Sequence, residues 1–350
     1  MPDASIVMSS LTAGGIEMVR KCQGELLDHS IAFPVDYVPA IKNALHRVKP
    51  AALVVMETEL WPNLVHLSQR YGVAVILTNG RVSEKSFKRY MRWKWLFSWT
   101  LKQFDLLLVQ TEGDRERFIS MGALPERISV LGNSKFDQPV RRLSTDEVER
   151  LRSDLGLPGR GWTLVVGSTR TLEEEKLIME AYQKLLSTAP DCCIIWAPRH
   201  VERAEELKQL FLDAGFQPGR RSEGRIETRQ VILDTYGELA DIYAVGDVAI
   251  IGNSLIAPGG GQNILQPMAH GKPVFFGPYM GENREIASLA IEAAVAFQTT
   301  SERLADDVLA ILQDEARRRD IEHRAVQLIE ENRGAAGRYA DSIVSLIKAK

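Results

Sequence analysis

Three consecutive glycines, Gly259 to Gly261, stand between an apolar run, Val248 to Ile251, and a polar pair that can begin a helix, Gln262 and Asn263. A second apolar run, Val274 to Phe276, follows. Glycine lets backbone N–H groups approach an anion, and a helix dipole favours negative charge at the N-terminus. This order of strand, glycine loop and helix start is typical of phosphate sites. Glycine-rich turns are also common without a ligand, so the loop alone leaves both interpretations open.

A second candidate anion site follows the apolar run Leu164 to Val166, ahead of a helix opened by Glu173 to Glu175. A helix start again offers N–H donors to a phosphate. Arg199 follows another apolar run, Cys192 to Trp196, and its guanidinium can add a cation to the same phosphate. The remaining residues of this candidate site are Gly167, Ser168, Thr169 and Arg170.

Polar residues also follow four apolar runs in the first part of the chain. The alternative interpretation is that strand ends meet solvent and are polar in any protein. We favour a functional polar rim because a carboxylate stands beside bulky apolar residues at 59–62. The residues of this rim are Glu57, Glu59, Trp61, Asn63, Asn79, Arg81, Ser83, Gln110, Asn133 and Lys135.

Strand-like runs alternate with helical segments through the first part of the chain and again beyond residue 160. This alternation predicts an α/β fold, with parallel sheets covered by helices on both faces. Ligands bind such sheets beyond the carboxyl ends of the strands, where these polar residues lie. The 350 residues are many for one core, and a charged stretch from Asp137 to Arg160 separates the two series. We predict a first domain at 1–145, a second at 160–325 and a helical segment at 326–350.

The segment 85–104 has the pattern of a helix with two apolar stripes. Tyr90, Trp93, Leu96, Phe97, Leu101 and Phe104 form a stripe that we expect to face the core. On the opposite side Met91, Trp95 and Trp99 stand among basic residues, Lys88, Arg92 and Lys102. Tryptophan among basic side chains suits a membrane interface or an anionic lipid. The alternative is a helix buried on two sides, with its basic residues solvated.

Composition excludes several classes of protein. A net charge of −3 gives no reason to expect nucleic acid, and three cysteines make no disulfide framework. No stretch reaches the roughly 18–20 apolar residues of a membrane span. The spacing of histidines and cysteines matches no metal site, and neither a P-loop nor a Gly-x-Ser-x-Gly turn occurs.

Eight segments, taken in order, resemble the Kdo transferases. These glycosyltransferases of lipopolysaccharide synthesis transfer 3-deoxy-D-manno-octulosonic acid (Kdo) from CMP-Kdo to a lipid A precursor. The segments are ETELWPN (57–63), NGRVSEKS (79–86), GNSKFD (132–137), GSTR (167–170), APRH (197–200), DTYGELADIY (234–243), GGGQN (259–263) and GPYMGENREI (277–286). The first segment and the DTYGEL and GGGQN pair are specific to the family, whereas GSTR and APRH would be weak alone.

The resemblance implies a GT-B fold, in which two Rossmann-like domains enclose a cleft, and inversion at the anomeric carbon without a metal or cofactor. Arg199 would then stabilise the leaving CMP phosphate, because protein donors must balance that charge if no metal does. Gly237, Glu238 and Leu239 would meet the cytosine, and Asn263 the phosphate or ribose. The polar rim would line the Kdo and acceptor side. The resemblance also implies a peripheral location on the cytoplasmic side of the inner membrane, through the segment 85–104.

Two departures from the family pattern affect these expectations. The family has an upstream strand that ends in Ser-Val-Gly-Glu, whose glutamate is the expected general base, and no counterpart occurs here. Because the first strand of a doubly wound sheet lies in its centre, we expect an incomplete N-terminal domain with a gap or a re-paired sheet, and impaired transfer. The second departure is Gln266, where the family usually has glutamate. An amide can still bond ribose hydroxyls, so nucleotide binding should persist.

Two other functions remain as alternatives. One is another GT-B enzyme, such as a nucleotide-sugar epimerase, against which ETELWPN and the tryptophan-rich segment argue. The other is a non-catalytic protein that binds a nucleotide or a lipid.

Overall fold

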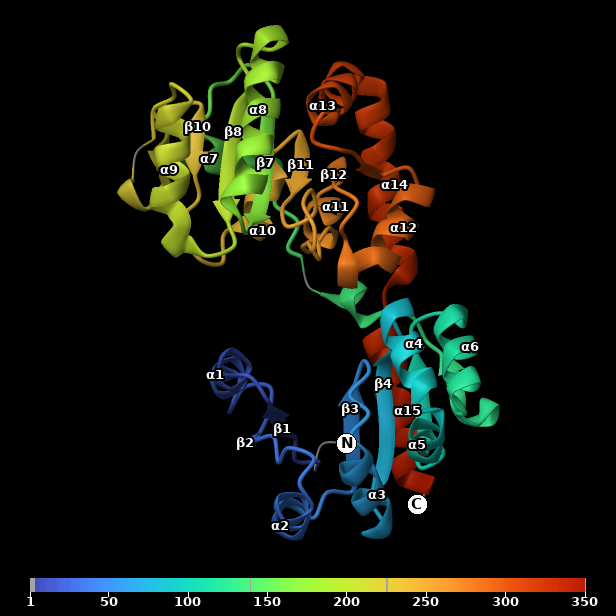
Figure 1. Cartoon of the computed structure of the whole chain (residues 1–350). Helices are drawn as coiled ribbons and strands as arrows, with labels where there is room; N and C mark the ends of the chain where they lie inside the picture. Colours follow the sequence, from blue (N-terminus) through green and yellow to red (C-terminus); the bar gives the residue numbers. More distant parts are fainter. Residues whose placement is uncertain (1–3, 139, 225, 350) are drawn as a thin grey trace. The chain divides into compact units, whose positions relative to one another are not determined.

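The computed structural model describes residues 4–138, 140–224 and 226–349. The chain forms two compact units: unit 1 comprises Met1–Asp137 and Arg333–Lys350, and unit 2 comprises Gln138–Asn332 (Figure 1). The division therefore falls at the start of the charged stretch, ahead of the predicted end of the first domain at 145. It also places the last helix in unit 1, where Ala335 and Tyr339 pack with Ile76 and Leu108 of the sheet. Both units are α/β, as the alternating pattern predicted.

Unit 1 contains a four-stranded parallel sheet in the order β3-β4-β5-β6 and a separate parallel pair, β1-β2. Its elements are β1 (Val7–Ser10), α1 (Ala13–Lys21), β2 (His29–Ala32), α2 (Val38–Val48), β3 (Ala52–Met56), α3 (Pro62–Arg70), β4 (Ala74–Gly80), α4 (Glu84–Arg92), α5 (Lys94–Leu101), β5 (Leu106–Val109), α6 (Glu112–Met121), η1 (Pro125–Arg127), β6 (Ile128–Val130), η2 (Ser134–Asp137) and α15 (Ala335–Ala349).

The sheet of unit 1 is interrupted. Among the strands that the structure describes, β1 pairs with β2 alone and β3 with β4 alone, so each has one unpaired edge. A doubly wound sheet would instead place a strand between them. The sequence predicted a gap or a re-paired sheet, and in the described part of unit 1 the strands form two separate sheets. On β3, only Val55 is buried, whereas all seven residues of β4 are.

Unit 2 contains one continuous parallel sheet in the order β13-β12-β11-β7-β8-β10-β9. Every residue of β8, β11 and β12 is buried, because helices cover this sheet on both faces. The elements are α7 (Thr145–Asp154), β7 (Thr163–Thr169), α8 (Leu172–Thr188), β8 (Cys193–Pro198), η3 (Val201–Arg203), α9 (Ala204–Asp213), β9 (Gly219–Arg220), η4 (Arg221–Glu223), β10 (Gln230–Ile232), α10 (Leu239–Ile242), η5 (Tyr243–Val245), β11 (Val248–Ile251), α11 (Leu265–Ala269), β12 (Val274–Phe276), η6 (Gly281–Asn283), α12 (Arg284–Glu292), β13 (Ala296–Gln298), α13 (Leu304–Gln313) and α14 (Glu315–Asn332).

The prediction of one helix over 85–104 is wrong, because the chain leaves helical geometry at Trp93 (φ −115°, ψ 34°). α4 and α5 are therefore separate helices, and the side chains after the break no longer continue the stripe before it. Trp93, expected in the core, is 55% exposed, and Trp95 and Trp99 are exposed as predicted. Tyr90, like Leu101 and Phe104, is buried in the core of unit 1. Among the described helices, none is both long enough and apolar enough to cross a membrane.

Candidate active site

In unit 2 the chain reverses its direction of winding between β7 and β11. β8 lies on one side of β7 and β11 on the other, which makes this the switch point where doubly wound sheets bind ligands. The N–H of Gly252, just after β11, donates to the carbonyl of Gly167 near the end of β7, at 2.8 Å. The predicted glycine loop and the predicted Gly167–Arg170 site thus flank the same point of the sheet.

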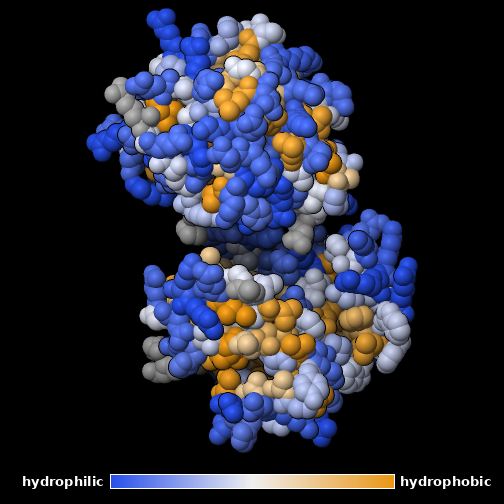
Figure 2. Space-filling view, turned by 60° about the vertical axis from the view of Figure 1, so that its left-hand side comes forward, coloured by the Kyte–Doolittle hydropathy of each residue, from blue (hydrophilic) through white to orange (hydrophobic). Residues whose placement is uncertain are grey.

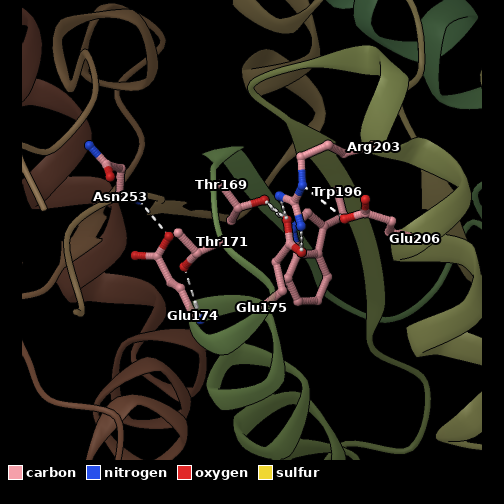
Figure 3. A network of polar contacts seen from close by, with 8 residues as sticks. All are labelled: Thr169, Thr171, Glu174, Glu175, Trp196, Arg203, Glu206 and Asn253. Carbon is pink, nitrogen blue, oxygen red and sulfur yellow. Dashed lines mark hydrogen bonds and ion pairs between the residues drawn. The ribbon is translucent and has the colours of Figure 1, made fainter. Parts of the chain in front are cut away.

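The end of β7 is held by buried polar contacts. Thr169 is fully buried, and its hydroxyl donates to Glu175 Oε1 at 2.7 Å and accepts from the indole of Trp196 at 3.2 Å (Figure 3). Its side chain therefore faces the protein interior. Ser168, in contrast, is half-buried with φ +62°, and Arg170 is exposed. Of the residues at this strand end, Ser168 and Arg170 are the ones whose side chains reach the surface.

Glu175 and Arg203 form a paired network that the sequence did not reveal. Arg203 donates from Nη1 and Nη2 to the two oxygens of Glu175 at 2.8 and 2.7 Å, and Glu175 is fully buried. The hydrogen bond with Glu175 raises the pKa of Arg203. The run Glu173–Glu175 was visible in the sequence, but only as a helix opening. The pair joins the start of α8 to η3 and so fixes the edge at which Arg199 lies.

Arg199 follows β8 directly and lies beside the end of β7. Its N–H donates to the carbonyl of Thr169 at 2.8 Å, because β7 and β8 are neighbours with Thr169 opposite Pro198. The residue is exposed. The structure therefore brings Ser168, Arg170 and Arg199 to one edge, as the sequence predicted from two separate strand ends.

The glycine loop packs main chain against main chain. The N–H of Gly260 donates to the carbonyl of Tyr279 at 2.8 Å, and that of Gly261 to the carbonyl of Asn253 at 2.7 Å. These two N–H groups are thus engaged within the protein. A Cβ on Gly259 would lie 2.4 Å from Cβ of Tyr279, and one on Gly261 would lie 2.6 Å from the sulfur of Met280. Glycine is required here by close packing as well as by positive φ.

Two further predicted residues lie in the same loop and in the short helix that follows it. Asn263 is half-buried: its amide donates to Gln138 Oε1 at 2.9 Å and its carbonyl oxygen accepts from the N–H of Leu265 at 2.8 Å. Gln266 is half-buried within α11. Asn263 therefore holds the start of α11, one residue later than the sequence indicated.

Gly237, Glu238 and Leu239 follow β10, two strands away from β7. Burial opposes ionisation of Glu238, but hydrogen bonds from Arg221 and Thr235 outweigh it, so the pKa of this carboxyl is lowered. The carboxylate is thus paired within the protein. Gly237 has φ +89° and leaves open space around its Cα.

In unit 1 the rim residues at three strand ends form a hydrogen-bonded chain. The amide of Asn133 donates to Gln110 Oε1 at 2.9 Å, and the amide of Gln110 donates to the carbonyl of Asn79 at 3.0 Å. Asn79 Oδ1 in turn accepts from the N–H of Ser134 at 3.1 Å. Asn79 adopts φ +52°, a backbone conformation that asparagine tolerates better than most residues. The carboxyl ends of β4, β5 and β6 are therefore joined in one network.

The remaining rim residues include one ion pair and one hydrogen bond from an indole to a carboxylate. Arg81 Nη2 lies 3.1 Å from Glu57 Oε2; the Arg81 side chain is 16% exposed and that of Glu57 is 35% exposed. Glu59 Oε2 accepts from the indole of Trp61 at 2.7 Å. Lys135 is half-buried beside Asn133, whose Oδ1 accepts its N–H at 2.9 Å.

Asn63 and Ser83 take part in hydrogen bonds that hold the starts of two helices in unit 1. The backbone N–H and side-chain amide of Asn63 both donate to Asp36, which also accepts from the N–H of Leu64 and so caps α3. Ser83 caps α4 by accepting from the N–H of Ser86 at 3.2 Å. Asp36 was not predicted, because its partners lie far away in the sequence. Over the described part of the chain, no group of three or more histidine, cysteine or acidic side chains could hold a metal ion.

The fold of the chain is shared with solved structures. A solved glycosyltransferase from Rickettsia africae is similar over 97% of this chain and 97% of its own, with a TM-score of 0.62 and 15% identity. At that identity the likeness shows the fold alone, which is GT-B, as the resemblance implied.

Sequence comparison then identifies the family. The family model described as 3-Deoxy-D-manno-octulosonic-acid transferase (kdotransferase) matches residues 1–138. The 3-deoxy-D-manno-octulosonic acid transferase of Haemophilus influenzae is 30% identical over 345 residues, which cover 97% of this chain and 80% of that protein. The chain belongs to the Kdo transferase family of glycosyltransferases. A bifunctional glycosyltransferase/methyltransferase of Fusobacterium nucleatum is 31% identical over 84% of this chain, which spans 46% of that longer protein.

Proposed function

We propose that this protein transfers Kdo from CMP-Kdo to a lipid A precursor, with unit 2 binding the donor nucleotide and unit 1 the acceptor. The observation that carries the proposal is the arrangement around the switch point of unit 2. There an exposed arginine, Arg199, lies at the same sheet edge as Ser168, Arg170 and the glycine loop. Family membership supports the identity of the sugar.

In this proposal Arg199 acts on the leaving group. When the bond between Kdo and the CMP phosphate breaks, negative charge develops on phosphate oxygens, and a fixed guanidinium lowers the energy of that state. No metal is assigned a role. Arg170 and the amides after Gly167 would bind the same phosphate, and Asn263 and Gln266 the ribose or phosphate. The loop at Gly237–Leu239 would meet the cytosine with its main chain, since the Glu238 carboxylate is already paired.

The glycine loop has a more limited role in this proposal than its sequence first indicated. The N–H groups of Gly260 and Gly261 are hydrogen-bonded within the protein, so we do not assign them as donors to the phosphate. We propose instead that the loop, lacking side chains, lets the nucleotide lie close to the main chain. Gly259 contributes in the same way, by its lack of a side chain.

For unit 1 we propose that the rim receives the charged groups of Kdo and the acceptor. Arg81 and Lys135 suit the sugar carboxylate or a lipid A phosphate, the first as a planar fork and the second as a point charge. The acceptor hydroxyl must lose a proton to a base. Glu57 is paired with Arg81 and Glu59 with the indole of Trp61, so we assign neither to that step and expect slow transfer.

We further propose that α4 and α5 contact the cytoplasmic face of the inner membrane. Trp95 is 70% exposed, Trp93 and Trp99 are also exposed, and the exposed basic residues Lys88 and Lys94 lie on the same two helices. Tryptophan at a lipid interface with cations nearby favours anionic bilayers. Sedimentation with vesicles containing anionic lipid should retain the protein, and replacing Trp95 by alanine should weaken that retention.

Calorimetric titration with CMP tests the donor site. We expect binding by the unmodified chain and a loss of about 10- to 100-fold in affinity for Arg199→Ala, because a charge-assisted contact to phosphate is removed. Arg229→Ala is the matched control. Arg229 is a surface residue that directly precedes β10 and forms an ion pair with Asp191. Absence of heat at millimolar CMP would refute the donor site, and equal weakening by both variants would refute the role of Arg199.

A further inference from the structure

Glu174 is a buried carboxylate, 1% exposed, that takes no part in the contacts assigned above to phosphate, ribose or base. It belongs to the first turn of α8 and reaches across to the loop that follows β11 (Figure 3). Its Oε2 accepts from the N–H of Asn253 at 2.6 Å, and its Oε1 accepts from the N–H groups of Ser254 and Leu255 at 2.8 and 3.0 Å. Three successive backbone donors therefore converge on one carboxylate.

The turn at 253–255 is also hydrogen-bonded to two glycine-containing loops, 259–261 and 277–281. The carbonyl of Asn253 accepts from the N–H of Gly261, and the carbonyl of Ser254 accepts from the N–H of Tyr279, at 2.7 and 3.0 Å. The carbonyl of Tyr279 accepts from the N–H of Gly260 at 2.8 Å. The three loops thus form a closed circuit of main-chain hydrogen bonds, and Glu174 anchors that circuit to α8.

At two glycines these loops approach one another main chain against main chain. A Cβ on Gly277 would lie 2.2 Å from the carbonyl oxygen of Ser254, and a Cβ on Gly281 would lie 2.7 Å from Cα of Gly260. Main chain packed this closely gains little from burial of apolar side chains. Its shape depends on hydrogen bonds, and those to an ionised carboxylate are stronger than those between neutral groups.

The neighbouring residue provides a contrast. Glu175 is equally buried, but its charge is balanced by Arg203 and its hydrogen bonds join β7 to η3. Glu174 accepts instead from three backbone N–H groups of the loop. Two adjacent glutamates therefore support different parts of the site: Glu175 the sheet edge, Glu174 the loops.

We propose that Glu174 is a positioning residue of the donor site, which holds the 253–255 turn and, through it, the 259–261 and 277–281 loops in the shape that accepts the nucleotide. This inference rests on the proposed donor site in unit 2. The carboxylate touches no substrate in this scheme. It acts by accepting three N–H groups, a role that glutamine cannot fill because one of its two terminal atoms is itself a donor.

The test compares Glu174→Gln with Glu175→Gln, the same change at the adjacent and equally buried position. Hydrogen exchange is followed in peptides that cover 252–262, and CMP affinity is measured by calorimetry. For Glu174→Gln we expect exchange at 253–255 and 260–261 to accelerate, and CMP affinity to fall about tenfold, the effect of losing one charged hydrogen bond. Glu175→Gln should lower the melting temperature but leave exchange in the loop peptides within about twofold of the unmodified protein, because its hydrogen bonds do not reach the 253–255 turn.

The two measurements separate this inference from the proposed function. Loop exchange needs no ligand, so it tests the positioning role even if the unmodified chain fails to bind CMP, an outcome that would refute the donor site alone. Normal CMP affinity in Glu174→Gln, or loop exchange no faster than in Glu175→Gln, would overturn the positioning role. If Glu174→Gln does not fold, Glu174→Asp keeps the charge but shortens the reach. It should then loosen the loop, and unchanged exchange in that variant would equally overturn the inference.

Discussion

The two units have the same parallel architecture but differ in how completely their sheets are built. In unit 2 seven strands form one continuous sheet, and each of the central strands β7, β8 and β11 has a partner on both sides. In unit 1 the strands divide into a group of four and a group of two. Exposed large apolar residues on β1 and β3, or directly beside them, include Ile6, Met8, Val54 and Met56, and Figure 2 shows a broad apolar area on unit 1.

This difference bears on the two halves of the proposed reaction. The donor-side residues of unit 2 stand on strands that are fixed on both edges, and buried pairs such as Glu175 with Arg203 hold their ends. On the acceptor side, Glu57 follows β3, a strand paired along one edge only among those described. A parallel pair such as β1-β2 is marginal by itself, because too little apolar surface is buried. We therefore expect unit 2 to keep its site geometry under conditions that loosen unit 1.

The largest effect should appear in hydrogen exchange. We expect backbone N–H groups of β1 and β2 to exchange orders of magnitude faster than those of β7 and β11, because exchange from a marginal pair needs only local opening. Mass spectrometry of the unmodified chain at neutral pH would measure this. Similar protection in β1 and β7 would break the comparison between the units.

A smaller effect is expected from the same substitution in both sheets. Val166→Ala in β7 should lower the free energy of unfolding by about 2 kcal/mol, since the side chain is fully buried between layers. Val54→Ala in β3 should cost less than about 0.5 kcal/mol, because the side chain is 42% exposed. Urea denaturation of the two variants provides the measurement. Equal losses would mean that β3 is as well packed as β7.

The smallest effect is expected from pH. Burial raises the pKa of Asp234 in unit 2, but hydrogen bonds from Ser222 and Arg220 outweigh burial and the net shift is downward. A lowered pKa stabilises the folded state above the ordinary carboxyl pKa, and this contribution is lost as pH falls through the folded value. Burial raises the pKa of Asp114 in unit 1, so acidification through that range favours the folded state there.

Acidification to below the ordinary aspartate pKa of 3.8 should therefore destabilise unit 2 through Asp234, whereas Asp114 works in the opposite direction in unit 1 as pH falls towards that value. Asp234→Asn should flatten the acid response of unit 2, followed by tryptophan fluorescence in a background whose unit 1 tryptophans are replaced by phenylalanine, and Asp114→Asn should not. The interpretation fails if Asp234→Asn leaves the acid response unchanged.

Much of the architecture could be predicted from local patterns. Short apolar runs at 164–166, 192–196, 248–251 and 274–276 predicted strands that the structure contains at nearly the same residues. The gap beside β3 was predicted from strand order in doubly wound sheets. The break at Trp93 was not, because the apolar spacing continues through it and only backbone geometry shows that the helix ends there.

The sequence by itself determined the α/β class, the family and the positions along the chain where polar residues follow strands, because these depend on composition and short-range spacing. Only the tertiary structure decided what those residues contact. Thr169 faces Glu175 and Trp196, the N–H groups of Gly260 and Gly261 bond to neighbouring loops, and Glu174 reaches a turn about eighty residues away. Such partners meet because parallel strands bring their carboxyl ends to one edge of the sheet. The local sequence pattern does not predict which donor bonds to which acceptor there.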